Sequence, residues 1–337
     1  MITAFLQETF RLLGGTQTGQ RGNAEADASR CIPLDQAVEH VVDETYGRLR
    51  AVPGYAERLK GPIQSTFLYI EGLVESIPDP VLCCRSTFVS DPRVNAFFAG
   101  PDHLREIFSQ SEEVRNLFDG APGAQECWAL LCMHKEERRQ LGMALQGGKV
   151  RKEVMQTGVS FTSHEVISPG ISEEDARRAL KCCIFNSLIT YIRRRTKTVK
   201  EQTEELENRR RMLSGRIEHR QEGAEGFEQM QAQLQEVEEQ LEQRDLRLDS
   251  LREHLEFVAD VLAHPADYVQ GDHQELRLNR LGIKLEEDAE ELGYAVPLSE
   301  IRVACQQPRI ATLVRFPREE LLPQQDYLKK ADLFLAV

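Results

Sequence analysis

A seven-residue repeat of apolar side chains is the feature that most constrains how this chain folds. It covers residues 227–262 in two adjacent rows, and Arg244 is the one charged member of either row. The first row is Phe227, Leu234, Leu241, Leu248, Leu255 and Leu262, and the second is Met230, Val237, Arg244, Leu251 and Val258. Two apolar rows with this period are the pattern of a coiled coil. The sequence therefore predicts helix with one apolar seam over this segment.

A second, less regular repeat with the same period precedes the first. Its members over 185–220 are Phe185, Ile192, Val199, Leu206 and Leu213. Residues 222–226 separate the two repeats and contain two glycines, which argues against one continuous helix. Each repeat spans 36 residues, which corresponds to about 54 Å of helix.

Opposite charges indicate how the two repeats pair. Residues 193–220 have a net charge of +5, whereas residues 221–256 have a net charge of -8. This difference favours pairing of the first segment with the second and disfavours parallel pairing of the acidic segment with itself. We therefore expect an antiparallel coiled-coil hairpin within one chain, projecting from the rest of the protein.

The N-terminal residues are predicted to form a helix on a flexible linker. An amphipathic helix over 1–13 places its apolar residues on one arc, namely Ile2, Phe5, Leu6, Phe10, Leu12 and Leu13. Residues 14–32 are rich in glycine and small polar residues, a composition that does not order itself. We expect this helix to dock by its apolar face on protein of the same complex, with membrane binding as the alternative.

The predicted body lies on both sides of the coiled coil in sequence. Apolar residues at helical spacing predict a run of helices over 33–120, the second of them starting at Pro62. Over 121–170 the apolar spacing changes to two, with a turn signal at Gly147-Gly148 and a signal for a bulge or break at Gly158, which predicts an antiparallel β meander.

The long helix and the hairpin are assigned to 171–264. Residues 265–337 are predicted to return to the body as β-strands, with a hairpin around the turn at 306–308. The predicted fold class is α+β: a helical and antiparallel β-meander body with a long projecting antiparallel coiled-coil hairpin and C-terminal β-strands.

Charge and composition restrict the class of protein. The formal net charge is -13, so a phosphate backbone or an anionic lipid surface would need a segregated basic patch to bind. Hydrophobic residues make up 41% of the chain, which is too apolar for a disordered protein, and no apolar run is long enough for a transmembrane segment. Eight cysteines without a recognisable secretory signal predict free thiols in a reducing cytoplasm.

Motifs of the common catalytic and phosphate-binding classes are missing from the sequence. The segment Gly147–Val150 resembles the end of a phosphate-binding loop, but Met143 stands in place of the first glycine and Val150 in place of the hydroxyl residue. The pairs Cys83-Cys84 and Cys182-Cys183 are adjacent in sequence, so on a helix their side chains diverge and do not share one metal. Both pairs are predicted to be buried structural thiols.

One predicted strand contains the best candidates for chemistry. Cys127 points to the opposite face from Cys132 and His134, which excludes a metal site made of all three. Cys132 and His134 share a face and could form a nucleophile and base, but a half-buried strand is the simpler interpretation. His164 is expected to be an ordinary sheet residue. We therefore predict no catalytic, cofactor-binding or metal-binding residue, and no cofactor.

Two runs of arginine, Arg193–Arg195 and Arg209–Arg211, raise the question of nucleic acid binding. Three successive helical residues spread around the helix, no aromatic residues lie between them, and the facing segment is acidic. We expect these arginines to pair within the hairpin, with nucleic acid or anionic lipid as the alternatives.

These features together favour a non-enzymatic cytoplasmic scaffold or interaction protein that acts through its coiled-coil hairpin. Its expected partner is another protein or a further copy of itself in a homo-oligomer, with no specific nucleic acid and no transmembrane segment. The alternatives are an enzyme with an unrecognised site in the β meander and a nucleic-acid-associated protein that uses the basic arm of the hairpin.

Overall fold

The computed structural model describes residues 32–323, except for 147–148, 219–226, 244–247, 249, 287–288, 290 and 305–306. The predicted amphipathic helix at 1–13 and nearly all of the predicted linker therefore lie outside the described residues. Nine α-helices and a seven-stranded mixed sheet form the regular structure of the described part, which confirms the predicted α+β class. Over these ranges, none of the helices combines the length and the apolar character needed to cross a bilayer.

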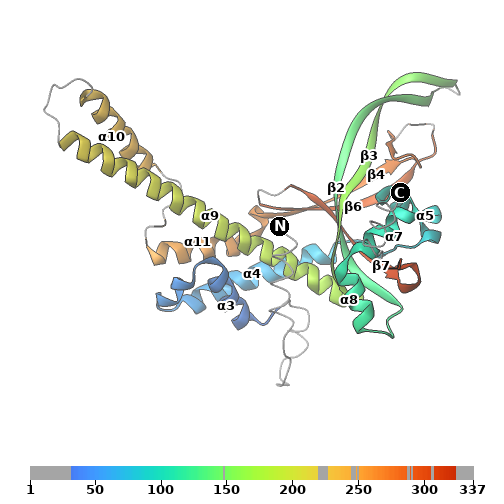
Figure 1. Ribbon diagram of the computed structural model, residues 1–337, viewed down its shortest axis with the longest axis horizontal. Helices are drawn as coiled ribbons and strands as arrows, with labels where there is room; N and C mark the ends of the chain where they lie inside the picture. Colours follow the sequence, from blue (N-terminus) through green and yellow to red (C-terminus); the bar gives the residue numbers. More distant parts are fainter. Residues whose placement is uncertain are drawn as a thin grey trace, which may run out of the picture. The chain divides into compact units, whose positions relative to one another are not determined.

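Two compact units divide the chain, and each is made from separated stretches of sequence (Figure 1). The sheet unit contains the described residues of 69–184 and 269–323, and the helical unit contains those of 32–68 and 185–268. The boundary falls inside two long helices, α4 (Tyr55–Glu75) and α9 (Glu173–Glu218).

All seven strands belong to the sheet unit. Their order is β1-β7-β2-β3-β5-β4-β6, with β1 parallel to β7 and the other neighbours antiparallel. Strand β6 also pairs with β7 in antiparallel fashion, with Glu300 opposite Ile310 and Ile301 opposite Arg309. These two strands form the predicted C-terminal hairpin. The strands are β1 (Val81–Leu82), β2 (Glu126–Gln146), β3 (Lys149–Gly170), β4 (Val269–Leu278), β5 (Ile283–Lys284), β6 (Tyr294–Val303) and β7 (Arg309–Pro317).

Strands β2 and β3 form one long hairpin where the sequence predicted a meander of shorter strands (Figure 1). On its outer edges β2 pairs with β7 only as far as Met133, and β3 pairs with β5 only at Thr157 and Gly158. Charged residues at 135–139 do not end the strand, because their side chains are exposed or half-buried where the hairpin leaves the sheet. We call residues 138–156, which extend beyond these pairings, the ribbon.

Three bulges interrupt the pairing of β3 with β2. At each one a residue of β3 adopts a left-handed backbone: Glu153 with φ 59°, Ser163 with φ 52° and Ser168 with φ 49°. The predicted bulge or break at Gly158 is wrong, since this glycine pairs regularly with Arg138. Because bulges bend a strand and increase its twist, they account for the curvature of the hairpin in Figure 1.

The core of the sheet unit forms between one face of β2 and a group of short helices. Alternate residues of β2 (Cys127, Ala129, Leu131 and Met133) meet phenylalanines of the helices in one buried cluster. The closest ring pair is Phe108 with Phe316 of β7, stacked with centroids 4.5 Å apart. The helices are α5 (Arg85–Ser90), α6 (Pro92–Phe97), α7 (Pro101–Gln110) and α8 (Glu112–Gly120).

The helical unit packs α3 (Leu34–Thr45) and the 3₁₀-helix η1 (Gly47–Ala51) with parts of the longer helices. The hydroxyl of Thr66 in α4 donates to the carbonyl oxygen of Leu262 at 2.6 Å. In the same unit, the rings of Phe67 and Phe185 lie 5.0 Å apart. Helix α4 therefore contacts α11 through the Thr66 hydroxyl and the base of α9 through the Phe67 ring. Helix α4 starts at Tyr55 rather than at the predicted Pro62, which lies inside the helix.

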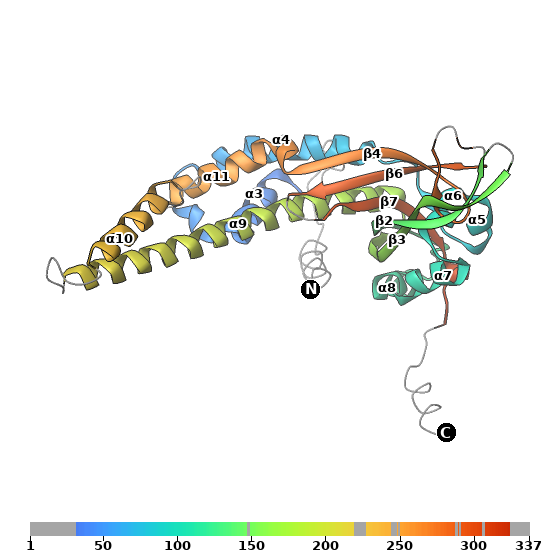
Figure 2. The same cartoon turned by 90° about the horizontal axis from the view of Figure 1, so that it is seen from above.

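The second heptad segment forms two helices, not one. Helix α10 (Phe227–Glu242) ends near the single charged seam position, Arg244, and α11 starts at Leu251 and ends at Ala263. Ser250 starts α11 through a capping box, in which its hydroxyl accepts from the Glu253 N–H and the Glu253 carboxylate accepts from the Ser250 N–H. Figures 1 and 2 both show α10 lying beside the distal part of α9.

Candidate functional site

The structure places Cys132 and His134 on β2 but gives them no catalytic arrangement. Cys132 is 7% exposed and pairs across the sheet with Glu165 and Ala311. Burial raises the pKa of its thiol far above the usual value, so the thiolate that acts as a nucleophile is disfavoured. Glu165 is engaged by Arg309, whose guanidinium donates to its carboxylate.

His134 lies opposite Thr162 on β3 and is half-buried. The Thr162 hydroxyl donates to the Glu136 carboxylate at 2.9 Å, so the side chain opposite His134 bonds elsewhere. Cys127 lies on the opposite face of β2 from Cys132, as predicted; this is the core face, and burial raises the pKa of its thiol to about 12. Within the described ranges no three His, Cys, Asp or Glu side chains are grouped in a way that could hold a metal ion.

His164 belongs to an aromatic cluster that the sequence did not indicate. Its ring stacks on Phe98 at 5.3 Å and meets His103 edge-on at 5.2 Å. Its Nε2 donates to the carbonyl oxygen of Phe97 at 2.7 Å. Burial lowers the pKa of His164, and the nearby His103 lowers it further, although the bond to Phe97 acts in the opposite direction. The arrangement fits a neutral structural histidine.

The cysteine pairs have different surroundings. Cys83 is fully buried, and burial raises the pKa of its thiol well above the usual value. Cys84 caps the start of α5, with its sulfur 3.0 Å from the Ser86 hydroxyl oxygen and 3.4 Å from that of Thr87. Burial raises the pKa of this thiol, but the bonds from Ser86 and Thr87 outweigh burial, so the pKa is lowered overall. Cys182 is buried as predicted, whereas Cys183 is half-buried.

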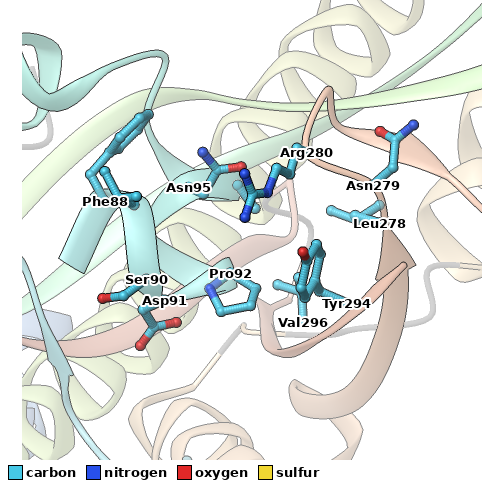
Figure 3. A pocket seen from close by; sticks show the side chains of 12 residues that line it. Phe88, Ser90, Asp91, Pro92, Asn95, Leu278, Asn279, Arg280, Tyr294 and Val296 are labelled. Carbon is cyan, nitrogen blue, oxygen red and sulfur yellow. The ribbon is translucent and has the colours of Figure 1, made fainter. Parts of the chain in front are cut away.

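A pocket of about 260 Å³ opens between α5, α6 and the adjoining ends of β4 and β6 (Figure 3). Its wall is mainly apolar, with residues Phe88, Val89, Pro92, Ala96, Leu278, Tyr294 and Val296. Figure 3 shows the side chains of Arg280 and Asn95 facing each other across it, and the Arg280 guanidinium lies 6.0 Å from the centre of the Tyr294 ring. No pattern in the sequence predicts this pocket, because its walls come from segments about 190 residues apart.

The chemistry of the pocket suits weak binding of a small molecule. Its volume is below the range of about 300–1,000 Å³ that is usual for ligand sites. Its one acid, Asp91, caps α6 by accepting from the Arg93 N–H at 2.8 Å and also pairs with the Arg93 side chain. Arg280 adds a positive charge, but five acidic residues follow at 286–291, so the charge of the region does not select an anion. Ser90 and Asp91 both line the pocket, but the Ser90 hydroxyl donates to the carbonyl oxygen of Ser86 at 3.2 Å and the Asp91 carboxylate is held by Arg93.

The ribbon exposes apolar side chains on one of its faces. Leu141 lies directly opposite Met155, and Met143 lies two residues further along β2, so all three share a face. They are 66%, 63% and 62% exposed, respectively. Arg139 and Lys152 belong to the same face by register, and both are exposed. The ribbon as a whole carries a net charge of +4.

The arginine runs of α9 find partners close to them. Arg193 pairs with Glu44 of α3 at 3.0 Å, and Arg211 donates to Asn208 of its own helix at 2.6 Å. Arg209–Arg211 are exposed. Glu44 and Asn208 lie outside the second heptad segment, and the expected pairing of the arginine runs with the acidic residues of that segment stays a prediction.

No family model, curated protein or solved structure matches this chain. Its function therefore has to be argued from the geometry of the described residues. Among the described residues, the candidate thiol of Cys132 is buried, and three of the nine exposed large apolar side chains lie on one face of the ribbon.

Proposed function

We propose that this chain is a non-enzymatic interaction protein and that α9 and α10 form an antiparallel coiled-coil hairpin which presents its binding surface. The observation that carries the proposal is burial along the heptad rows. Val199 and Leu213 of α9 and Met230 and Val237 of α10 are each at most 6% exposed. An arm of two helices can bury such residues only between its own helices or against a partner. The placement of α10 beside α9 in Figures 1 and 2 supports the first arrangement.

The outer surface of α10 indicates the kind of partner. This helix contains five glutamates and no lysine or arginine, and all five glutamates are exposed. If α9 and α10 bury their apolar rows against each other, the surface of α10 left for a partner is this acidic face. Such a face complements a basic protein surface. None of the six cysteines that the structure describes forms a disulfide, which supports the proposed cytoplasmic location.

Disulfide crosslinking tests the hairpin. Cysteines are introduced at Leu206 and Leu241, with Cys183 replaced by serine to remove the half-buried thiol. If the turn centres near residue 223, these two positions approach each other, and oxidation of the dilute chain gives a crosslink within one molecule. A pair at Leu206 and Glu238, which is exposed, is the control and crosslinks poorly. Crosslinks that form only between chains would refute the intramolecular hairpin.

A second experiment tests association against catalysis. Glu236→Lys with Glu239→Lys reverses charge on the outer face of α10 without touching the seam, whereas Cys132→Ser with His134→Ala removes the candidate chemical groups. The chain's cellular activity, scored as complementation of its deletion, is expected to be lost in the first variant and retained in the second. Loss of activity in the second variant with an unchanged melting curve would instead favour an enzyme.

A further inference from the structure

The ribbon carries a binding surface that is independent of α9 and α10. Its exposed face combines Leu141, Met143 and Met155, and beyond the pairings at Met133 and Thr157 the two strands have only each other among the described strands. A two-stranded hairpin is marginally stable in water, and an exposed apolar patch on it marks an interaction site. We propose that this face binds a second copy of the same chain in a two-fold symmetric dimer.

Charge decides which part of a second copy can cover the ribbon. Two ribbons would each bring a net charge of +4 to their contact, including Arg139 and Lys152 on the apolar face, so ribbon-to-ribbon packing is disfavoured. The rest of the chain has a net charge of -17. The matching surface is therefore one that is both acidic and apolar.

One such surface lies at the end of the sheet where β4 ends and β6 begins. Leu281 is 84% exposed and Leu292 is 72% exposed, and residues 279–293 have a net charge of -3. Glu286 is exposed, and Glu291 accepts from the Asn279 side chain at 2.6 Å. We call Leu281, Glu286, Glu291 and Leu292 the loop patch.

The loop patch is held in place by contacts that leave its leucines exposed. Arg277 donates to the carbonyl oxygens of Glu286 and Glu291, at 3.1 and 3.3 Å. Asn279 also accepts from the N–H groups of Leu281 and Ile283, both at 2.9 Å. An ordered patch loses less conformational entropy when a partner binds.

The topology makes the ribbon and the loop patch neighbours within one chain. Strand β5 follows Leu281 directly, and its two residues pair with Thr157 and Gly158, where the ribbon leaves the sheet. Both surfaces belong to the sheet unit. A two-fold axis beside the pairing of Gly158 with β5 would place each ribbon on the loop patch of the other copy. The same contact then forms twice, and the assembly ends at two copies.

A charge-swap experiment tests this dimer. The ribbon variant is Arg139→Glu with Lys152→Glu, and the loop variant is Glu286→Lys with Leu281→Lys. A control with the same charge change on the other ribbon face is Arg138→Glu with Arg151→Glu, because these residues pair with Gly158 and Ala144. Mass and affinity are measured by sedimentation velocity on the full chain in 50 mM salt, with a second wild-type run in 0.5 M salt.

The wild type is expected at twice the mass of one chain, with weaker association at high salt. Each swap variant alone should dimerise at least tenfold more weakly, and the control should change much less. An equimolar mixture of the two swap variants should recover the dimer, because each ribbon then meets a loop patch of opposite charge.

Three results would overturn the proposal: a monomeric wild type, swap variants that dimerise as well as the wild type, or a mixture without recovery. A 30-base-pair DNA duplex is titrated in parallel, and binding that depends on Arg139 and Lys152 by a monomeric wild type would assign the ribbon to nucleic acid instead. The crosslink between positions 206 and 241 does not depend on the ribbon, so failure of this proposal is distinguishable from failure of the hairpin.

Discussion

Replacing Val237 by aspartate should unfold α10 and leave the sheet unit folded. Val237 is fully buried at the middle of a 16-residue helix. An isolated helix of that length is marginal in water, so α10 depends on its packing for stability. The substitution removes the apolar contact and places a charge where the valine was buried.

The size of the effect follows from the burial of the side chain. Burying a valine contributes about 1.5–3 kcal/mol, and burying an unpaired carboxylate costs more than this in addition. A loss of about 3 kcal/mol corresponds to roughly a 100-fold change in the equilibrium between folded and unfolded α10. Because a helix of this length has little stability of its own, a loss of this size is expected to unfold α10 in most molecules.

Hydrogen exchange and limited proteolysis of the full chain measure this opening. Exchange protection in α10 should fall about 100-fold, and a glutamate-specific protease should cut within 228–242, where all five of the helix's glutamates lie. Gln231→Asp adds the same side chain at an exposed position of the same helix and should behave like the wild type. Equal protection in the two variants would show that the burial of Val237 does not hold α10 in place, and would refute the seam.

Three further predictions concern the sheet unit. Because burial lowers the pKa of His164, its neutral form is favoured in the folded state; the stability that this confers is complete above about pH 6.5 and declines as the pH falls and the unfolded state takes up a proton. His164→Phe should therefore flatten the fall in unfolding free energy between pH 7.5 and 5, and a pH slope equal to that of the wild type would contradict this. Glu320→Ala removes a buried carboxylate whose oxygen lies 3.0 Å from the Arg105 side chain. It should lower the free energy of unfolding in urea by about 3 kcal/mol. A loss below about 0.5 kcal/mol would show that this ion pair does not stabilise the fold. Cys132 should resist a thiol reagent at pH 8 until the chain unfolds, and labelling of the native chain would restore it as a candidate nucleophile.

Local chemistry in the sequence controls part of the secondary structure. Asp91 and Ser111 are typical N-cap residues, and they start α6 and α8 by accepting backbone N–H groups at their N-termini. The change of apolar spacing predicted over 121–170 coincides with β2 and β3, and the predicted turn at 306–308 separates β6 from β7. These features depend on neighbouring residues, so a single sequence contains the information for them.

The break between α10 and α11 also had a local signal, but the heptad pattern outweighed it. Ser250 and Glu253 have the spacing of a capping box, which marks a helix start inside the predicted continuous seam. Leu248 keeps the heptad phase and is buried although it lies outside both helices. Apolar periodicity reports which residues are buried, and it does not show that the backbone between them is helical.

The pocket and the loop patch had no comparable signal. The pocket joins Asn95 to Arg280, and the loop patch depends on Arg277 reaching backbone carbonyls of the following loop. Both follow from the order of strands in the sheet, which brings β4 and β6 together beside α6. Side-chain spacing along the chain does not determine that order.

The character of the ribbon face depends on a single residue of β3. With regular pairing beyond Gly142 and Val154, Glu153 would lie opposite Met143, and Lys152 would fall on the other face. The bulge at Glu153 removes this residue from the pairing and places Lys152 opposite Met143 instead. The charge directly opposite Met143 is therefore positive rather than negative. Alternation counted along the sequence places Glu153 at this point, because it contains no information about where a strand gains an unpaired residue.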